Sequence, residues 1–120
     1  MPKLDVIRLK KKSRVLEVEF DDGLVANLSF ELLRVYSPSA EVAGHGPGQS
    51  VLQTGKEFIN ITAIEPVGNY AVKLIYDDGH DTGIYTWNYL YQLAKNKESK
   101  WNTYLDALTN AGYERGTDGQ

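Results

Sequence analysis

Hydrophobic and polar residues alternate along several short segments of the chain, the pattern of half-buried β-strands. Between positions 15 and 20, every second residue is apolar and shares one face: Leu16, Val18 and Phe20. The clearest alternation runs from Tyr70 to Tyr76. Similar patterns predict further strands over residues 5–9, 24–28, 59–64 and 84–85.

A turn motif occurs twice between these strands. Phe-Asp-Asp-Gly occupies residues 20–23, and Tyr-Asp-Asp-Gly occupies residues 76–79, 56 positions later. Asp-Gly between alternating segments predicts a hairpin, because the turn needs a positive φ that Asp and Gly tolerate. If the two copies are aligned with this spacing of 56, Ser29 in the first copy corresponds to Tyr85 in the second. The chain is therefore predicted to contain two hairpin-then-helix modules.

Helical periodicity follows each hairpin. Ser29 is placed to cap a short helix ending near Tyr36, and Thr86 is placed to cap a second helix. The second helix has apolar residues at i, i+3, i+4 and i+7: Trp87, Leu90, Tyr91 and Ala94. Ser99 is placed to cap a final helix that ends at Gly112. These elements predict an α+β domain with an antiparallel or mixed sheet, helices on one face and a C-terminal helix.

Length and charge limit the possible functions. The 120 residues predict one domain over residues 1–113, followed by a flexible tail over 114–120. The net charge of −3 argues against a nucleic-acid-binding protein, which usually carries a basic surface. No secretory signal opens the chain, and no apolar stretch approaches the ~20 residues that span a bilayer. We therefore expect a cytoplasmic protein that binds neither nucleic acid nor membrane.

The sequence contains no cysteine. This excludes disulfides, thiolate nucleophiles, and zinc or iron–sulfur clusters bound by cysteine of this chain. The remaining candidates for chemistry are the two histidines.

His80 directly follows the second Asp-Gly turn and lies between Asp78 and Asp81. A neighbouring carboxylate can orient an imidazole for metal binding or for general-base chemistry. The same histidine could instead fix the turn by hydrogen bonds or face solvent. His45 lies in a loop over residues 42–50 that is rich in glycine, with no evident partner.

Aromatic residues are the second notable feature. The chain has eight tyrosines and two tryptophans. Several gather in the second module and beyond it: Tyr85, Trp87, Tyr89, Tyr91 and Tyr104. Their rings can form the core with hydroxyl groups at its rim, or, if exposed together, a protein-binding patch.

Four strings of residues point to a family. They are Ser-Pro-Ser-Ala-Glu at 37–41, Glu-Pro-Val-Gly-Asn-Tyr at 65–70, Tyr-Asp-Asp-Gly-His at 76–80 and Thr-Gly-Ile-Tyr-Thr-Trp at 82–87. Together they resemble the gamma-butyrobetaine-hydroxylase-like N-terminal domain family over residues 4–93. In this family the domain precedes the catalytic domain of two dioxygenases, is appended to some iron–sulfur carrier ATPases, or stands alone in small bacterial proteins. This chain resembles the stand-alone form.

The resemblance also indicates where a structural zinc would lie. In the dioxygenase members three cysteines and the histidine of Asp-Gly-His bind it, and the matching positions here are Ser37, Ser39, Val42 and His80. Serine hydroxyls are poor zinc ligands and valine is none. We therefore expect the zinc site to be lost, no cofactor, and His80 held by hydrogen bonds to Ser37 or Ser39. The facial triad of the dioxygenases is absent as well, so no enzymatic activity is expected.

The resemblance implies a non-catalytic binding or adaptor domain whose protein partner belongs to iron–sulfur cluster maturation. The expected binding surface combines the second hairpin with the segment from residue 34 to residue 41: Arg34, Ser37, Ser39, Glu41, Asp78, His80, Asp81, Tyr85 and Trp87. Two alternatives remain open. One is a small iron- or zinc-binding protein that uses His80, His45 and nearby carboxylates such as Glu41 or Asp81. The other is a homodimer formed through the aromatic residues of the second module.

Overall fold

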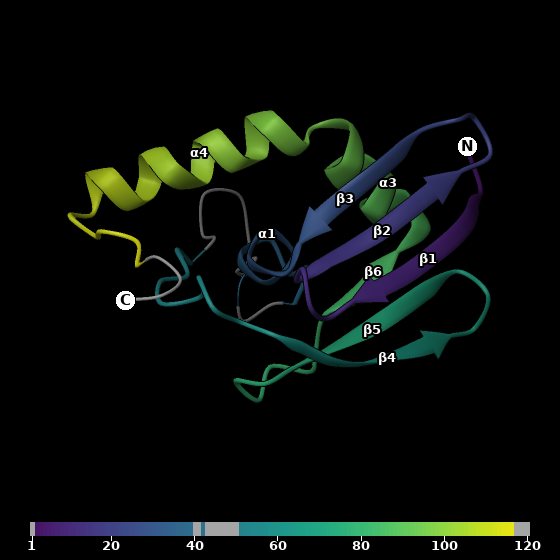
Figure 1. Ribbon diagram of the computed structural model, residues 1–120, viewed down its shortest axis with the longest axis horizontal. Helices are drawn as coiled ribbons and strands as arrows, with labels where there is room; N and C mark the ends of the chain where they lie inside the picture. The colour runs from purple at the N-terminus through teal and green to yellow at the C-terminus, as the bar shows by residue number, and fades with distance from the viewer. Residues whose placement is uncertain (1, 40–41, 43–50, 117–120) are drawn as a thin grey trace.

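The computed structural model of the protein describes residues 2–39, 42 and 51–116 (Figure 1). Two antiparallel three-stranded sheets follow one another, each with its strands in chain order. The first contains β1 (Leu4–Lys10), β2 (Val15–Phe20) and β3 (Val25–Ser29). The second contains β4 (Ile61–Val67), β5 (Ala71–Tyr76) and β6 (Ile84–Thr86).

A helix follows each sheet. Helix α1 (Phe30–Val35) follows β3, helix α3 (Trp87–Lys95) follows β6, and α4 (Lys97–Asn110) is the C-terminal helix. Helix α3 packs against β2, β3 and β6, whereas α4 extends beyond the sheets (Figure 1). The predicted α+β fold of two hairpin-then-helix modules and a C-terminal helix is confirmed.

The two predicted turns have nearly the same backbone. Gly23 has a φ of 92° and Gly79 a φ of 88°, values that favour glycine. In the first turn the Phe20 amide donates to the Leu24 carbonyl at 2.9 Å. In the second, the amide of Tyr76 donates to the carbonyl of residue 80 at 3.0 Å.

Strand register shows where the modules differ. Val15 pairs with Ser29 in the first sheet, and Ala71 pairs with Thr86 in the second. The counterpart of β2 thus lies 56 positions later, but the counterpart of β3 lies 57 positions later. The structural equivalent of Ser29 is therefore Thr86, and the predicted pairing of Ser29 with Tyr85 is wrong by one residue. The second module has one extra residue between its turn and its last strand.

Both predicted N-caps of the module helices are confirmed. Ser29 Oγ accepts from the amide three residues later at 3.0 Å, and Thr86 Oγ1 does the same at 3.1 Å. The predicted cap of the final helix is wrong. Helix α4 begins at Lys97, because Asn96 ends α3 and starts α4 directly, and Ser99 lies within the first turn.

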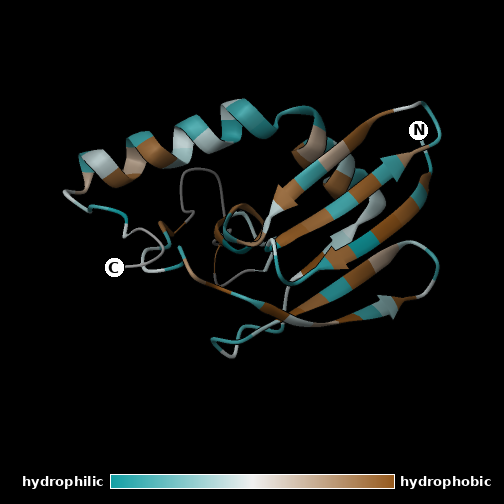
Figure 2. Ribbon diagram, in the orientation of Figure 1, coloured by the Kyte–Doolittle hydropathy of each residue, from teal (hydrophilic) through white to brown (hydrophobic). Residues whose placement is uncertain are grey.

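The core fills the space between the two sheets and the module helices. Figure 2 shows hydrophobic and hydrophilic residues alternating along β2 and a hydrophobic stripe along α4. The inward residues of β2 and β5 are almost fully buried: Leu16, Val18, Phe20, Val72, Leu74 and Tyr76. A smaller cluster of Val35, Tyr104 and Leu108 joins α4 to α1. No helix in the described part of the chain is long and apolar enough to cross a bilayer.

Helix α4 ends at a glycine, as predicted. Gly112 has a φ of 74°, and the amide of Tyr113 reaches back to the Leu108 carbonyl at 2.9 Å. The chain then turns toward the domain. Arg115, expected to lie in a flexible tail, instead forms an ion pair with the buried Glu31. Residues 117–120 and most of the predicted loop over 42–50 lie outside the described residues.

Candidate functional site

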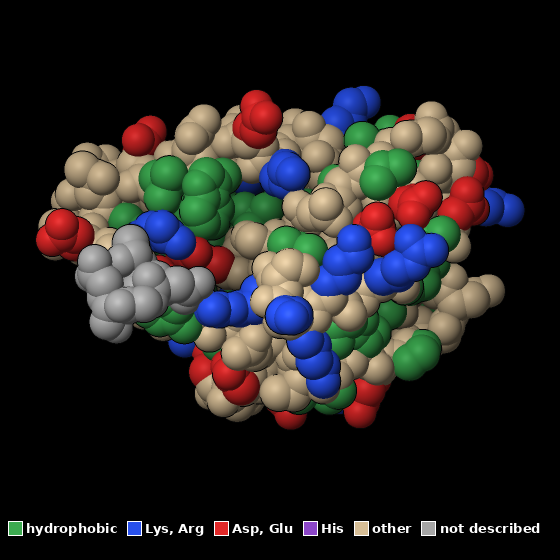
Figure 3. Space-filling model, viewed as in Figure 1, with side chains coloured by type: hydrophobic (Ala, Val, Ile, Leu, Met, Phe, Trp, Pro, Cys, Tyr) green, Lys and Arg blue, Asp and Glu red, His purple; other side chains and the backbone are tan. Residues whose placement is uncertain are grey.

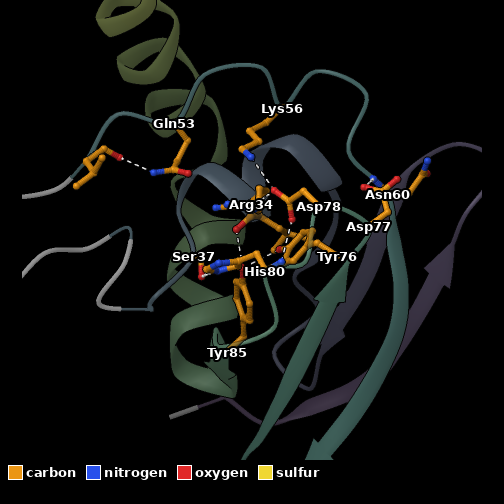
Figure 4. Close-up of polar contacts among 12 residues, drawn as sticks. Arg34, Ser37, Gln53, Lys56, Asn60, Tyr76, Asp77, Asp78, His80 and Tyr85 are labelled. Carbon is orange, nitrogen blue, oxygen red and sulfur yellow. Dashed lines mark hydrogen bonds and ion pairs between the residues drawn. The ribbon is translucent and has the colours of Figure 1, made fainter.

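The second turn is the centre of a polar cluster in which Arg34, Ser37 and His80 are buried and Asp78 lies at the surface (Figure 4). Asp78 Oδ2 accepts from Lys56 Nζ at 2.6 Å and from Arg34 Nε at 3.0 Å. Its other oxygen, Oδ1, accepts from the amide of His80 at 3.1 Å. One carboxylate therefore joins the turn to α1 and to the segment that precedes β4.

These contacts determine the protonation of Asp78. Burial alone would raise the pKa of its carboxyl, but the hydrogen bonds from Lys56, the His80 amide and Arg34 outweigh burial. The pKa falls from its usual value of 3.8 to about 2. Asp78 is thus an anion throughout the neutral range and a poor proton donor or acceptor there.

Arg34 is buried beneath this carboxylate. Its side chain is 8% exposed, and its guanidinium carbon lies 5.9 Å from the centre of the Tyr76 ring. Among the described residues, its Nη1 atom has no hydrogen-bond partner. Such a charge is tolerated in the interior only while its anionic partner is present, so Asp78 and Arg34 stabilise the fold as a pair.

His80 is held on the opposite side of the turn. It is 5% exposed, and its Nε2 atom shares a 2.8 Å hydrogen bond with Ser37 Oγ. Ser37 Oγ also accepts from the Ser39 amide at 3.3 Å, and the Ser39 hydroxyl bonds Thr82 Oγ1 at 2.7 Å. The expectation that a serine at this position holds His80 by hydrogen bonding is confirmed.

A glycine makes this arrangement possible. A Cβ atom on Gly83 would lie 2.4 Å from Ser37 Oγ and 3.1 Å from the Tyr85 ring. Both distances are too short for unstrained contact, so only glycine lets β6 approach the end of α1 this closely. Gly83 lies in the part of the second module that contains its extra residue.

Tyr85 is not a surface residue. It is 0% exposed, its hydroxyl donates to the Leu33 carbonyl at 2.6 Å, and that hydroxyl is 2.7 Å from the Tyr76 hydroxyl. Burial raises the pKa of both phenols. The expectation that Tyr85 is an exposed anchor is therefore wrong. The one-residue offset places its side chain on the core face of β6, opposite to that of Ile84.

The remaining predicted surface residues differ in position. Asp81 is exposed, and Trp87 is half-buried with its Nε1 donating to the Asn69 carbonyl at 2.8 Å. Glu41 and His45 lie outside the described residues. Arg34, Ser37, Ser39 and His80 are all buried, so they support the turn from within. Lys56 was not among the predicted site residues, because nothing local to residue 56 indicates a carboxylate that is 22 positions away.

The residues present do not fit a zinc ion. Ser37 and Ser39 use their hydroxyls on His80 and Thr82, and Val42 is apolar and buried. Within residues 2–39, 42 and 51–116, no three His, Cys, Asp or Glu side chains converge as a metal site. The alternative that combines His80 with His45 and Glu41 involves residues outside this part of the chain.

Comparisons with known proteins agree with this architecture. Residues 7–91 match the family model described as gamma-butyrobetaine hydroxylase-like, N-terminal. No curated protein matches significantly. One NMR solution structure is 57% identical over 96% of this chain and 86% of its own, with a TM-score of 0.80. A second is 45% identical over 100% of this chain and 94% of its own, with a TM-score of 0.84.

A crystal structure at 1.93 Å from Acidithiobacillus ferrooxidans is also similar. It is 43% identical over 76% of this chain and 91% of its own, with a TM-score of 0.62. That protein is described as one of unknown function in the DUF971 family.

Proposed function

Because the chain belongs to the gamma-butyrobetaine hydroxylase-like N-terminal domain family, we propose that it is a non-catalytic adaptor domain that binds a protein partner. The partner we propose is a component of iron–sulfur cluster assembly, by analogy with family members appended to iron–sulfur carrier ATPases. The analogy concerns domain association alone, so the partner must be tested separately from the surface.

The observation that carries the proposal is a set of exposed and half-buried apolar side chains at β6, which we call the β6 patch. Its members are Tyr70 and Trp87, which are neighbours, and Ile84, which pairs with Lys73 of β5. Tyr70 is 54% exposed and Ile84 is 44% exposed, although both are large apolar side chains. The amide of Trp87 donates to the Tyr70 carbonyl at 3.0 Å, so the two aromatic residues are neighbours. Exposed aromatic residues beside polar groups are typical of protein-binding surfaces.

The outward face of the first sheet is different, although Val25 of β3 is also exposed. Its outward side chains form ion pairs, with Arg8 2.9 Å from Glu17 and 3.3 Å from Glu19, and Lys10 3.6 Å from Glu17. Figure 3 shows acidic and basic side chains intermingled over this face. The contrast favours the β6 patch, with the exposed Asp81 and the Glu65–Lys73 ion pair as a polar rim.

The polar cluster around Asp78 also favours a non-catalytic role. Its hydroxyl, imidazole and carboxylate groups bond one another across the fold, and Asp78 has a pKa of about 2. A general acid or base is expected to have a pKa near the working pH and access to a substrate. These groups instead fix the turn that precedes the patch.

The test is affinity capture from a soluble extract of the source organism. The full chain is immobilised beside the double variant Tyr70→Ser/Ile84→Ser, which removes exposed apolar groups and leaves the core intact. Val25→Ser is the matched control, because Val25 is equally exposed but lies on β3. We expect iron–sulfur assembly proteins on the wild type and on Val25→Ser, and their loss from the double variant.

Three results would overturn the proposal. Equal capture by all three forms would show that the β6 patch does not bind the partner. Enrichment of unrelated proteins alone would remove the iron–sulfur assignment. Light scattering that shows a dimer of the wild type and a monomer of the double variant would assign the patch to self-association.

A further inference from the structure

A second surface feature shares no residue with the β6 patch, and the inference drawn from it does not depend on the proposed adaptor function. An open cavity of about 460 Å³ is lined by the end of α1, residues 51–53, Tyr89 of α3 and one face of α4. This volume is within the range of small-molecule sites in proteins. Helix α4 begins after residue 91, where the family match ends, so the cavity depends on an element outside the matched region.

The walls of this α4 cavity are apolar. Rings of Tyr36, Tyr89 and Tyr104 line it, and their hydroxyls donate to groups of the protein. Val42 and Val51 form another part of the wall, joined by a 2.8 Å hydrogen bond from the Val51 amide to the Val42 carbonyl. Aromatic faces and aliphatic groups are therefore what a ligand would meet over most of the surface.

One charge interrupts these apolar walls. Among the residues that the structure describes, Lys100 is the only charged one lining the α4 cavity, and its Nζ atom lies 5.0 Å from the centre of the Tyr36 ring. Among the described residues, no carboxylate forms an ion pair with it. The aromatic ring only partly replaces an anion, so this ammonium group is available to a negatively charged ligand.

In a neighbouring cavity, by contrast, the positively charged side chains are paired with other groups of the protein. This cavity has a volume of about 540 Å³ and lies on the other side of α4, beside the N-terminal end of α1. Arg115 there binds Glu31, and Lys97 Nζ donates to the Asn27 carbonyl at 3.3 Å. Its cations already have polar partners within the chain, whereas Lys100 contacts an aromatic ring and no carboxylate of the described residues.

From this geometry we propose that the α4 cavity binds a small monocarboxylate with an apolar body. The hydrocarbon part would pack on the three tyrosine rings, and the carboxylate would pair with Lys100. Thr103 and Gln53, which also line the cavity, can donate further hydrogen bonds to the same carboxylate.

The test uses the full chain labelled with ¹⁵N and two probes that differ in charge, phenylbutyrate and phenylbutanol. Each is titrated at neutral pH while amide chemical shifts are followed by NMR. We expect shifts concentrated at residues 35–37, 51–53 and 100–107, and about tenfold tighter binding of the acid than of the alcohol.

Two variants locate the charge effect. Lys100→Gln should make the affinities for acid and alcohol equal. Lys95→Gln is the matched control, since Lys95 also lies over a tyrosine ring, at 5.8 Å from the centre of Tyr91, but does not line the cavity. It should keep the tenfold preference. Thr103→Trp, at an exposed position of α4, should block both probes while the amide spectrum remains that of a folded protein.

The proposal is overturned if wild-type protein binds acid and alcohol equally, or if neither shifts the cavity amides. It is also overturned if Lys95→Gln lowers the acid preference as much as Lys100→Gln, because the effect would then come from overall charge. None of these outcomes depends on a protein partner.

Discussion

The two Asp-Asp-Gly turns have the same backbone but support different structures. In both, the second aspartate accepts through Oδ1 from the amide two residues later, at 3.0 Å in Asp22 and 3.1 Å in Asp78. The difference lies at Oδ2. In Asp22 this oxygen accepts from the Tyr91 hydroxyl at an exposed position. In Asp78 it accepts from two cations, one of them buried.

An extra residue between His80 and β6 accompanies this difference. Beside it Gly83 approaches Ser37 closely, and Ser37 also shares a hydrogen bond with the buried His80. The first module keeps an ordinary hairpin, whereas the second becomes the point where α1, β6 and the segment before β4 meet. A repeated local motif thus provides the strands, and the contacts of Asp78, His80 and Gly83 distinguish the second copy from the first.

The largest difference between the turns should follow loss of the carboxylate charge. Asp78→Asn leaves buried Arg34 without an anion, and we expect it to lower the free energy of unfolding by about 2–4 kcal/mol. Asp22→Asn, its counterpart in the first turn, should cost much less, because the Asp22 carboxylate is exposed to solvent. Urea unfolding of both variants measures this. Equal losses would show that the two turns are energetically alike.

The close approach at Gly83 gives the next largest effect. Gly83→Ala places a methyl group against Ser37 and Tyr85 and should destabilise the fold by about 1–3 kcal/mol. At the 57-residue offset, the first-module counterpart is Ala26, which is buried without such crowding. Ala26→Gly should cost about 1 kcal/mol through backbone entropy and lost packing. A stable Gly83→Ala variant would contradict the observed approach of β6 to α1.

Acid should weaken the second turn more than the first. The folded pKa of Asp78, about 2, lies below the usual 3.8, so its stabilising contribution is complete above pH 4 and is lost as pH falls toward 2. We expect this loss to be about 1–2 kcal/mol, because part of the carboxylate remains in water. Unfolding measured between pH 5 and pH 2 should show the loss in wild type and its absence in Asp78→Asn.

The smallest effect should be the same in both modules. Ser29 and Thr86 cap their helices through matching side-chain contacts. Ser29→Ala and Thr86→Ala should each cost about 1 kcal/mol, measured by thermal or urea unfolding. If only one variant lost stability, the two caps would have the same geometry but different energetic contributions.

Much of the fold could be predicted because its signals are local. The Asp-Gly turns, the alternation within β2 and β5, and the caps Ser29 and Thr86 each depend on residues a few positions apart. The cap at Ser99 was wrong for a local reason too. Serine is a frequent N-cap, but the geometry of Asn96, which ends one helix and starts the next, decided where α4 begins.

The site was harder to predict because its geometry depends on register. Tyr85 shares its strand with the exposed Ile84, and a shift of one residue exchanges which of them faces the core. The sequence alignment placed Tyr85 opposite Ser29 and so gave no sign of that shift. The ion pair between Lys56 and Asp78, and the β6 patch itself, join residues that come together only when the second sheet has formed.

The end of α4 has a consequence for folding order. Its terminal glycine directs Arg115 back to Glu31, a contact that closes 84 positions of chain. Closing so long a segment costs conformational entropy before the contact forms, whereas each module closes through short hairpins. The modules should therefore assemble first and α4 should dock last. The cavity beneath α4 would then be the last part of the molecule to form and the first to open.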